Sequence, residues 1–255
     1  MEIRKLNAAR GWIWVKQGYQ LIMRNPLLSI ALALVGASML FFAILIPLIG
    51  PLLAVLLMPL LMAGYMRVCR ALEEAEEVEF AQLFAGLKKQ PSRLIALGGY
   101  TLLGLLIASM VMMVVGGEAL NKLLQSFQSA NDPELLVNAM STAGSGVVLG
   151  LMLGFALVCL LMMAFQYAPM LVFFSNVPPL VALRVSLAGF LRNLIPYTVY
   201  SLIIQAIGLV LSILPFGVGM IVFIPLCFTS LYVSYRNIFP FADEIPAALV
   251  QEAGA

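Results

Sequence analysis

Apolar residues dominate six long segments of the chain, which are separated by polar stretches or by short turns containing proline and glycine. The segments are residues 27–46, 48–66, 94–115, 147–174, 194–214 and 216–235, and none of them contains Asp, Glu, Lys or Arg. About 20 apolar residues of helix cross a hydrocarbon core about 30 Å thick. The pattern therefore predicts an all-α membrane protein with six transmembrane helices.

Composition strengthens this prediction. Hydrophobic residues make up 63% of the 255 residues and charged residues only 10%, whereas soluble domains contain about 45–50% apolar and about 25% charged residues. Water is a poor solvent for such a surface. We therefore expect residues 1–255 to form a single integral membrane domain.

Charged residues are distributed unequally between the two sides that six spans define. Thirteen of the 14 Lys and Arg residues and nine acidic residues fall on the side of the chain ends, and Lys122 with three acidic residues falls on the other. Basic residues favour the cytoplasmic side of a membrane. We expect a multi-pass protein of the bacterial inner (cytoplasmic) membrane, with both termini in the cytoplasm. A net charge of +2 gives no support for a nucleic acid partner.

A short segment before the first, third and fifth spans has a similar pattern each time. Ala85-Gly86 precedes Lys89 by the spacing with which Ala188-Gly189 precedes Arg192, and Pro59 precedes Arg70 by 11 residues as Pro225 precedes Arg236. Several matches in one order favour an internal repeat. We expect three quasi-repeated units, at about 8–70, 78–174 and 178–238, each an amphipathic interfacial helix followed by a helical hairpin.

The three short segments are predicted to be amphipathic helices that end in a basic residue and an amide. Their apolar stripes are Trp12, Val15, Tyr19 and Ile22; Phe80, Leu83, Phe84 and Leu87; and Leu180, Leu183, Leu187, Phe190 and Leu191, with Arg184, Ser186 and Arg192 off the last stripe. Such helices lie in the headgroup plane with the apolar face in the bilayer. Alternatively, they cover the end of the bundle as part of its core. Both interpretations place them at the membrane surface.

The connections on the far side of the membrane are short, with one exception. Pro47 to Pro51 and Pro215-Phe216-Gly217 leave almost no loop, whereas the middle hairpin carries a periplasmic insert at about 116–146. Leu120, Leu123, Leu124 and Phe127 keep helical spacing within the insert, and Asn131-Asp132-Pro133 suggests a new helix start. We expect a short pair of helices on the outer surface.

Residues that carry chemistry are scarce. The chain contains no His, the commonest proton shuttle and metal ligand, and the predicted spans carry no charge of the kind that marks ion paths. Carboxamides at Gln166 and Gln205 are candidates for a substrate pathway, although such groups usually bond between helices. We expect no enzyme, no catalytic residue, no cofactor and no metal site.

Five glutamates crowd residues 73–79. Such a cluster suits a divalent cation or a basic partner, but a solvated extension of the second span explains it more simply.

The stretch Gly11-Trp12-Ile13-Trp14, Gly18-Tyr19-Gln20-Leu21 and Arg24-Asn25-Pro26, with the repeated hairpins behind it, resembles an uncharacterised family of proteobacterial inner-membrane proteins. The chain is more distantly similar to the YciC-like family and to the membrane domain fused to some glycerophosphodiester phosphodiesterases. The resemblance extends over essentially the whole length and implies a six-helix inner-membrane protein. Because the chain has no catalytic phosphodiesterase motif, no activity is implied.

Three functions fit these observations. The first is a non-enzymatic protein that binds membrane lipid or a membrane protein partner, including a second copy, through its cytoplasmic-face helices. The contact residues would be Trp12, Trp14, Lys16, Arg24, Lys88, Lys89, Arg184 and Arg192. The second is a passive carrier or channel for a small neutral or apolar solute. The third is an accessory subunit of a larger membrane complex, docked through the insert or the glutamates.

Overall fold

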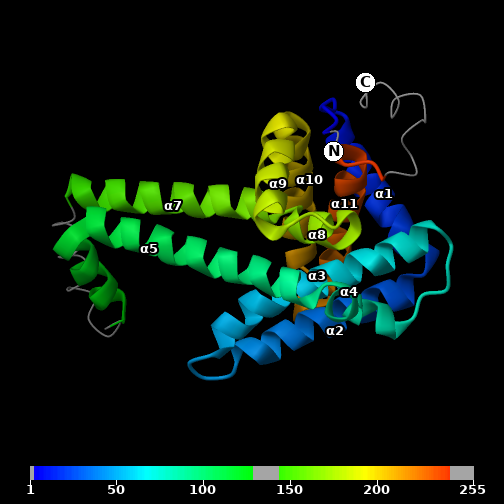
Figure 1. The fold of residues 1–255 in the computed structure, drawn as a ribbon, viewed down its shortest axis with the longest axis horizontal. Helices are drawn as coiled ribbons and strands as arrows, with labels where there is room; N and C mark the ends of the chain where they lie inside the picture. Colours follow the sequence, from blue (N-terminus) through cyan, green and yellow to red (C-terminus); the bar gives the residue numbers. More distant parts are fainter. Residues whose placement is uncertain (1–2, 129–143, 242–255) are drawn as a thin grey trace. The chain divides into compact units, whose positions relative to one another are not determined.

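The computed structural model describes residues 3–128 and 144–241, whose regular elements are all helical (Figure 1). In chain order these are α1 (Arg10–Arg24), α2 (Pro26–Ile44), α3 (Gly50–Glu73), the 3-10 helix η1 (Phe80–Phe84), α4 (Ala85–Lys89), α5 (Pro91–Gln128), α7 (Ser145–Phe165), α8 (Ala168–Ser175), α9 (Pro179–Arg192), α10 (Leu194–Ser212), the 3-10 helix η2 (Pro215–Gly217) and α11 (Val218–Ile238). The prediction of an all-α fold is confirmed.

Six of these helical stretches have the length and apolar character needed to cross a bilayer, so the six predicted spans are confirmed. They are Pro26–Ile44, Gly50–Glu73, Pro91–Gln125, Ser145–Ser175, Leu194–Ser212 and Val218–Ile238. Several helices continue beyond the predicted limits, as α3 does from Met66 to Glu73. Apolar runs mark the part of a helix that lies in hydrocarbon, whereas the hydrogen-bonded helix extends into its polar flank.

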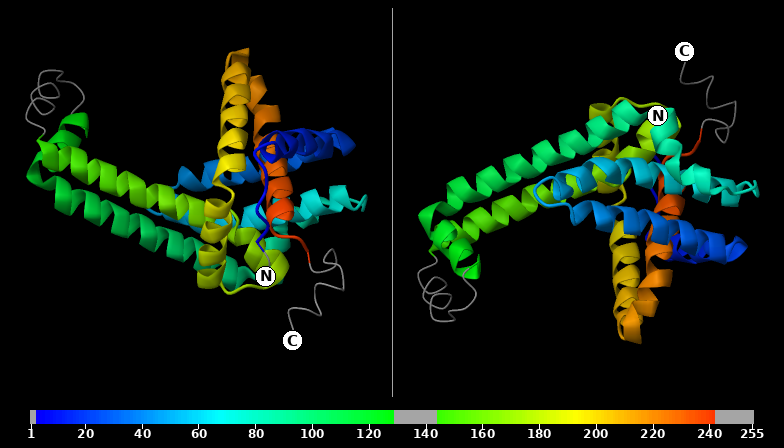
Figure 2. Two further views of the ribbon diagram at one scale, coloured as in Figure 1. Left: turned by 90° about the horizontal axis from the view of Figure 1, so that it is seen from above. Right: turned by 90° about the horizontal axis from the view of Figure 1, so that it is seen from below.

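The chain divides into two compact units, of which the first comprises residues 1–98 and 164–255. Its most buried spans are α3 and α11, with 61% and 50% of the apolar window inside the protein, against 11% for α10. Helix α1 lies along α11, as both views of Figure 2 show, and also packs on α10. The core of this unit therefore forms around α3, α11 and α1.

The second unit, residues 99–163, is the outer part of the α5–α7 hairpin. A Cβ atom added at Gly150 would lie 2.8 Å from the Met112 carbonyl oxygen, and one at Gly154 would lie 2.8 Å from the Met112 Cβ. These two glycines, at small-xxx-small spacing, let the helices approach closely. Their close approach occurs within one hairpin.

The predicted insert is described in part. Gly117 interrupts α5 with φ 59° and ψ −154°, after which the helix continues to Gln128. The predicted helix through Leu120, Leu123 and Leu124 is therefore present. Asn131-Asp132-Pro133, where a second helix was expected, lies outside the described residues.

The two short turns agree with their sequence pattern. Helix α2 ends at Ile44 and α3 begins at Gly50. A Cβ atom added at Gly50 would lie only 2.5 Å from the Ile44 carbonyl oxygen, so the turn requires glycine there. Gly217 has φ 69° between η2 and α11, a left-handed conformation that favours glycine. Both hairpins close with almost no loop.

Short helices precede each pair of spans, and the amides that follow them have related backbone conformations. Asn25 has φ −150° and ψ 79°, Gln90 has φ −150° and ψ 55°, and Asn193 has φ −117° and ψ 31°. The Asn25 side chain accepts a hydrogen bond from the Leu28 N–H at 3.3 Å, capping α2. This likeness supports common origin, and the threefold repeat stays a prediction.

Candidate functional site at the polar ends of the spans

Helix α1 has one face in the protein and another that is exposed. Gly11, Trp14, Val15, Gly18, Leu21 and Ile22 are buried at helical spacing. Trp12, Tyr19 and Met23 are exposed by 55%, 51% and 47%, and Lys16 lies among them on the same face. The predicted stripe therefore mixes two faces, because Val15 and Ile22 face the protein whereas Trp12 and Tyr19 are exposed.

Trp14 requires a correction. Its side chain is fully buried and meets the ring of Tyr200 on α10 edge-on, with the ring centroids 5.9 Å apart. A ring enclosed by protein cannot contact lipid, so Trp14 is a core residue and only Trp12 of the pair is available to the bilayer.

The second short segment departs from its prediction. It consists of η1 and the five-residue α4 rather than one amphipathic α-helix, and it buries Leu83 while Phe80 and Leu87 are exposed. A Cβ at Gly64 would overlap the Leu83 carbonyl group, and one at Gly86 would overlap that of Leu60. The backbone of this segment therefore lies so close to α3 that side chains larger than that of glycine do not fit at Gly64 and Gly86.

The third segment, α9, also buries small residues. Its inner face comprises Ala182, Ser186, Gly189 and Phe190, and the Tyr167 N–H donates to the Ser186 hydroxyl at 3.0 Å. Leu180 and Leu191 of the predicted stripe are instead exposed. Ser186 was predicted to lie off the apolar stripe and proves to be the inward residue.

Basic residues remain on the exposed surfaces of these segments. Lys88 and Lys89 of α4 and Arg184 and Arg192 of α9 are all exposed. The Lys89 ammonium lies 5.1 Å from the ring centroid of Phe173, a cation–π contact. The four side chains are accessible, and their contact with lipid or a partner stays a prediction.

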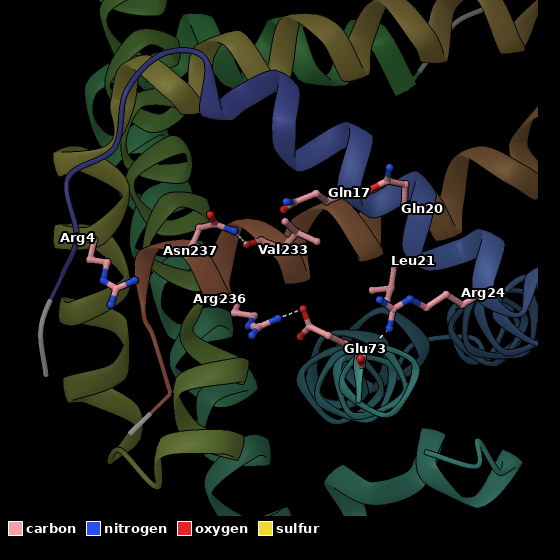
Figure 3. Close-up of a pocket in the computed structure, with 9 residues that line it drawn as sticks. All are labelled: Arg4, Gln17, Gln20, Leu21, Arg24, Glu73, Val233, Arg236 and Asn237. Atoms are coloured by element: carbon pink, nitrogen blue, oxygen red, sulfur yellow. Dashed lines mark hydrogen bonds and ion pairs between the residues drawn. The ribbon is translucent and has the colours of Figure 1, made fainter. Parts of the chain in front are cut away.

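A polar pocket of about 370 Å³ lies among α1, the end of α3 and the end of α11 (Figure 3). Its lining residues come from distant parts of the chain: Arg4, Gln17, Gln20, Leu21, Arg24, Glu73, Val233, Arg236 and Asn237. Arg4 is held by its backbone, whose N–H donates to the Ile238 carbonyl at 3.1 Å and whose carbonyl accepts from the Asn193 amide at 2.9 Å.

Glu73 is the centre of this pocket. Its carboxylate forms an ion pair with Arg236 and accepts a hydrogen bond from the Tyr232 hydroxyl at 2.7 Å. Arg24 donates from Nη1 to the Leu72 and Glu73 carbonyls at 2.8 and 2.7 Å. A cation at the C-terminus of a helix compensates its dipole and satisfies its last carbonyls. Arg24, predicted as an outward contact, therefore joins α1 to α3.

The other glutamates of the run also have neighbours. Helix α3 ends at Glu73 rather than extending through the run, because Ala75 has φ 55° and reverses the chain. Arg67 then donates to Glu76 and Arg70 to Glu74, both at 2.7 Å. The predicted helical extension is therefore wrong, although the glutamates that follow Glu73 are exposed, as was expected of a solvated segment.

The pathway candidates are far less alike than the sequence suggested. Gln166 and Tyr197 exchange two hydrogen bonds, at 2.7 and 2.9 Å, in a half-buried pair. Gln205 is exposed on α10. A pathway through both carboxamides stays a prediction.

Sequence reasoning missed most of the pocket. None of Arg4, Gln17, Gln20, Arg236 and Asn237 was predicted to be a site residue, and Glu73 was grouped with its neighbours. One signal was available, since Glu73 and Arg236 each follow a proline-containing span that ends on the same side. That pattern indicates that Glu73 and Arg236 lie at a similar depth in the membrane, but it does not indicate which helices are adjacent.

Removing the Glu73 carboxylate should destabilise the fold. We expect Glu73→Ala to cost about 1–3 kcal/mol, because it breaks the half-buried ion pair with Arg236 and the hydrogen bond from Tyr232. Thermal unfolding in detergent measures this, with Glu77→Ala, an exposed glutamate of the same run, as the matched control. Equal melting temperatures for the two variants would contradict the role given to Glu73.

The fold and this site define a multi-pass helical membrane protein whose polar span ends enclose an arginine-lined pocket. The chain is 27% identical, over 274 aligned residues, to a probable inner membrane protein of Burkholderia thailandensis; the alignment covers 96% of this chain and 98% of that protein. No protein-family model matches the chain, and no solved structure matches it significantly.

Proposed function

We propose that this is a non-enzymatic protein of the bacterial inner membrane that binds anionic lipid through α1, α4 and α9, with both termini in the cytoplasm. The full-length similarity to a probable inner membrane protein supports the location. The excess of Lys and Arg on the side of the termini supports the orientation. The sequence resemblance to the YciC-like family is compatible with this proposal and adds no activity.

One observation carries the proposal: α1 exposes aromatic and basic residues on one face, and α4 and α9 expose basic residues. On α1, Trp12 and Tyr19 flank Lys16 on the exposed face. Aromatic rings favour the headgroup region, and each basic residue near an anionic leaflet contributes about 1 kcal/mol. Had Trp12 and Tyr19 faced inward instead, α1 would have covered the protein core with its aromatic side chains.

The chemistry of the pocket favours binding over catalysis. Its titratable side chains are three arginines and one glutamate, and that glutamate is already in an ion pair. Arginine stays protonated and cannot act as a base. These groups support the proposal of a binding role for the pocket.

Exposed basic residues should determine the lipid preference. We expect the triple change Lys16→Gln, Lys88→Gln and Arg192→Gln to reduce enrichment of phosphatidylglycerol around the protein at least tenfold, given about 1 kcal/mol for each charge. The measurement is mass spectrometry of lipids retained after reconstitution in mixed phosphatidylglycerol and phosphatidylethanolamine nanodiscs. Because none of the three side chains is buried, the melting temperature should stay unchanged.

A second variant tests whether position matters. Lys122→Gln removes the basic residue expected on the opposite side of the membrane and should leave the enrichment unchanged. Wild-type enrichment in the triple variant would overturn the proposal. The melting temperature of the triple variant shows whether any loss of lipid results from unfolding.

A further inference from the structure

The pocket beside Glu73 contains more positive than negative side-chain charge. Three arginines and one glutamate line it. Arg236 pairs with the Glu73 carboxylate, and Arg24 donates to the last carbonyls of α3, where the helix dipole carries about half a negative charge. Arg4 contributes a third guanidinium, and its hydrogen bonds to other described residues are made by its backbone.

We propose that this pocket binds the phosphate group of a singly charged phosphodiester, with a phospholipid headgroup as its source. This inference rests on the proposed function and identifies the group that it recognises. Arginine presents planar, paired donors that match phosphate oxygens. Among the described residues the Arg4 guanidinium has no ion-pair partner, and Arg24 uses only Nη1 on the α3 carbonyls, so the pocket can match one negative charge. Figure 3 shows Arg4 and Arg24 on either side of the Glu73–Arg236 pair.

The neutral groups of the pocket indicate what the phosphate carries. Gln17 and Gln20 present carboxamides from one side of α1, and a carboxamide both donates to and accepts from a hydroxyl group. A headgroup ammonium would bind best beside a carboxylate, and the Glu73 carboxylate, whose charge Arg236 already balances, accepts from Arg236 and from Tyr232. The site therefore favours a hydroxylated headgroup such as glycerol over an aminated one.

The size of the pocket fits a headgroup. A volume of about 370 Å³ equals the space of roughly a dozen water molecules and lies near the lower limit of small-molecule sites. Leu21 and Val233 are its apolar lining residues, so an acyl chain would gain little by entering. The chains of a bound lipid would stay in the bilayer beside the spans.

Arg4→Gln tests the site without removing a contact that holds the fold, because the backbone bonds of Arg4 remain. Native mass spectrometry of the full chain, titrated with phosphatidylglycerol and with phosphatidylethanolamine, should show wild-type preference for phosphatidylglycerol. Arg4→Gln should weaken phosphatidylglycerol binding about tenfold, the usual effect of losing one charged hydrogen bond. Lys5→Gln, an equal loss of charge one residue away and outside the lining, should not.

A second variant addresses the headgroup. Gln17→Ala with Gln20→Ala should reduce the preference for phosphatidylglycerol over phosphatidic acid, while phosphate binding persists. Unchanged lipid binding in Arg4→Gln, or an equal loss in Lys5→Gln, would overturn the pocket and leave the exposed basic face as the binding surface. The pocket and the proposed function therefore fail in different experiments.

Soluble glycerophosphoglycerol identifies the source of the ligand. If it binds wild-type protein more weakly than the lipid does, and Arg4→Gln removes it, the lipid headgroup is supported. If it binds as tightly as the lipid, a free phosphodiester is the ligand, which overturns the lipid source and retains the site. If neither ligand distinguishes Arg4→Gln from wild type, the inference is wrong.

Discussion

Trp14→Ala should lower the melting temperature by on the order of 10 °C. Large-to-small replacement of a buried tryptophan costs about 3–5 kcal/mol, and about 1 kcal/mol shifts the melting temperature of a chain this long by roughly 2–4 °C. Trp14 is fully buried against Tyr200. Removal of its ring therefore leaves a cavity where α1 packs on α10, and differential scanning fluorimetry in detergent measures the loss.

Trp12→Ala is the matched control, since it removes the same side chain two residues away. Trp12 is exposed by 55%, so this variant should keep the wild-type melting temperature while weakening the contact of α1 with the bilayer. Trp14→Phe should fall between the two, because a smaller ring still fills part of the space. Equal effects of Trp12→Ala and Trp14→Ala would contradict the assignment of separate faces to α1.

The transmembrane helices could be predicted from the sequence because hydrocarbon imposes a simple requirement. Uncharged runs of about 20 residues, such as 27–46, have no stable alternative to a helix in a bilayer. The ends of α3 and α5 were harder to predict. Beyond the apolar runs, α3 continues through Arg70 to Glu73 and α5 continues past Glu118 and Lys122, so charged residues do not end either helix.

The faces of the short helices could not be predicted in the same way. Apolar periodicity assumes that large hydrophobic residues face the protein. In α1 the protein side is formed in part by Gly11 and Gly18, which permit close backbone contact, while Trp12 is exposed. In α9 it includes Gly189, which lies against the ring of Phe239, while Leu180 is exposed. Where lipid replaces water, an outward leucine or tryptophan costs nothing, so hydrophobicity no longer distinguishes inside from outside.

The arginine pocket escaped prediction because it depends on which helices are adjacent. Arg4, Arg24, Glu73 and Arg236 lie in four separate stretches of sequence, and each has an ordinary explanation as a flanking charge. Only the packing of α1 against α11, and of α3 beside both, brings them together. A sequence indicates how deep a residue lies in the membrane, whereas the structure is needed to show which helices are neighbours.

Gly18→Ala should separate α1 from α11. The added Cβ would lie 2.7 Å from the Ser230 backbone nitrogen and 2.8 Å from its Cα, and neither backbone atom can rotate away. Overpacking of this kind typically costs about 1–3 kcal/mol, more than the gain of up to about 1 kcal/mol that alanine brings to a helix. Trp14 reports the movement, because in a Trp12→Phe background it is the single tryptophan of the chain.

In that background, Gly18→Ala should shift Trp14 emission to longer wavelength and lower the melting temperature. Gly99→Ala is the control, since a Cβ at Gly99 meets nothing within 4 Å, and it should be neutral or slightly stabilising. Because Arg24 and the pocket glutamines belong to α1, displacement of this helix should also weaken phosphatidylglycerol binding. A destabilised Gly18→Ala with intact lipid preference would mean that the exposed basic face, rather than the pocket, selects the lipid.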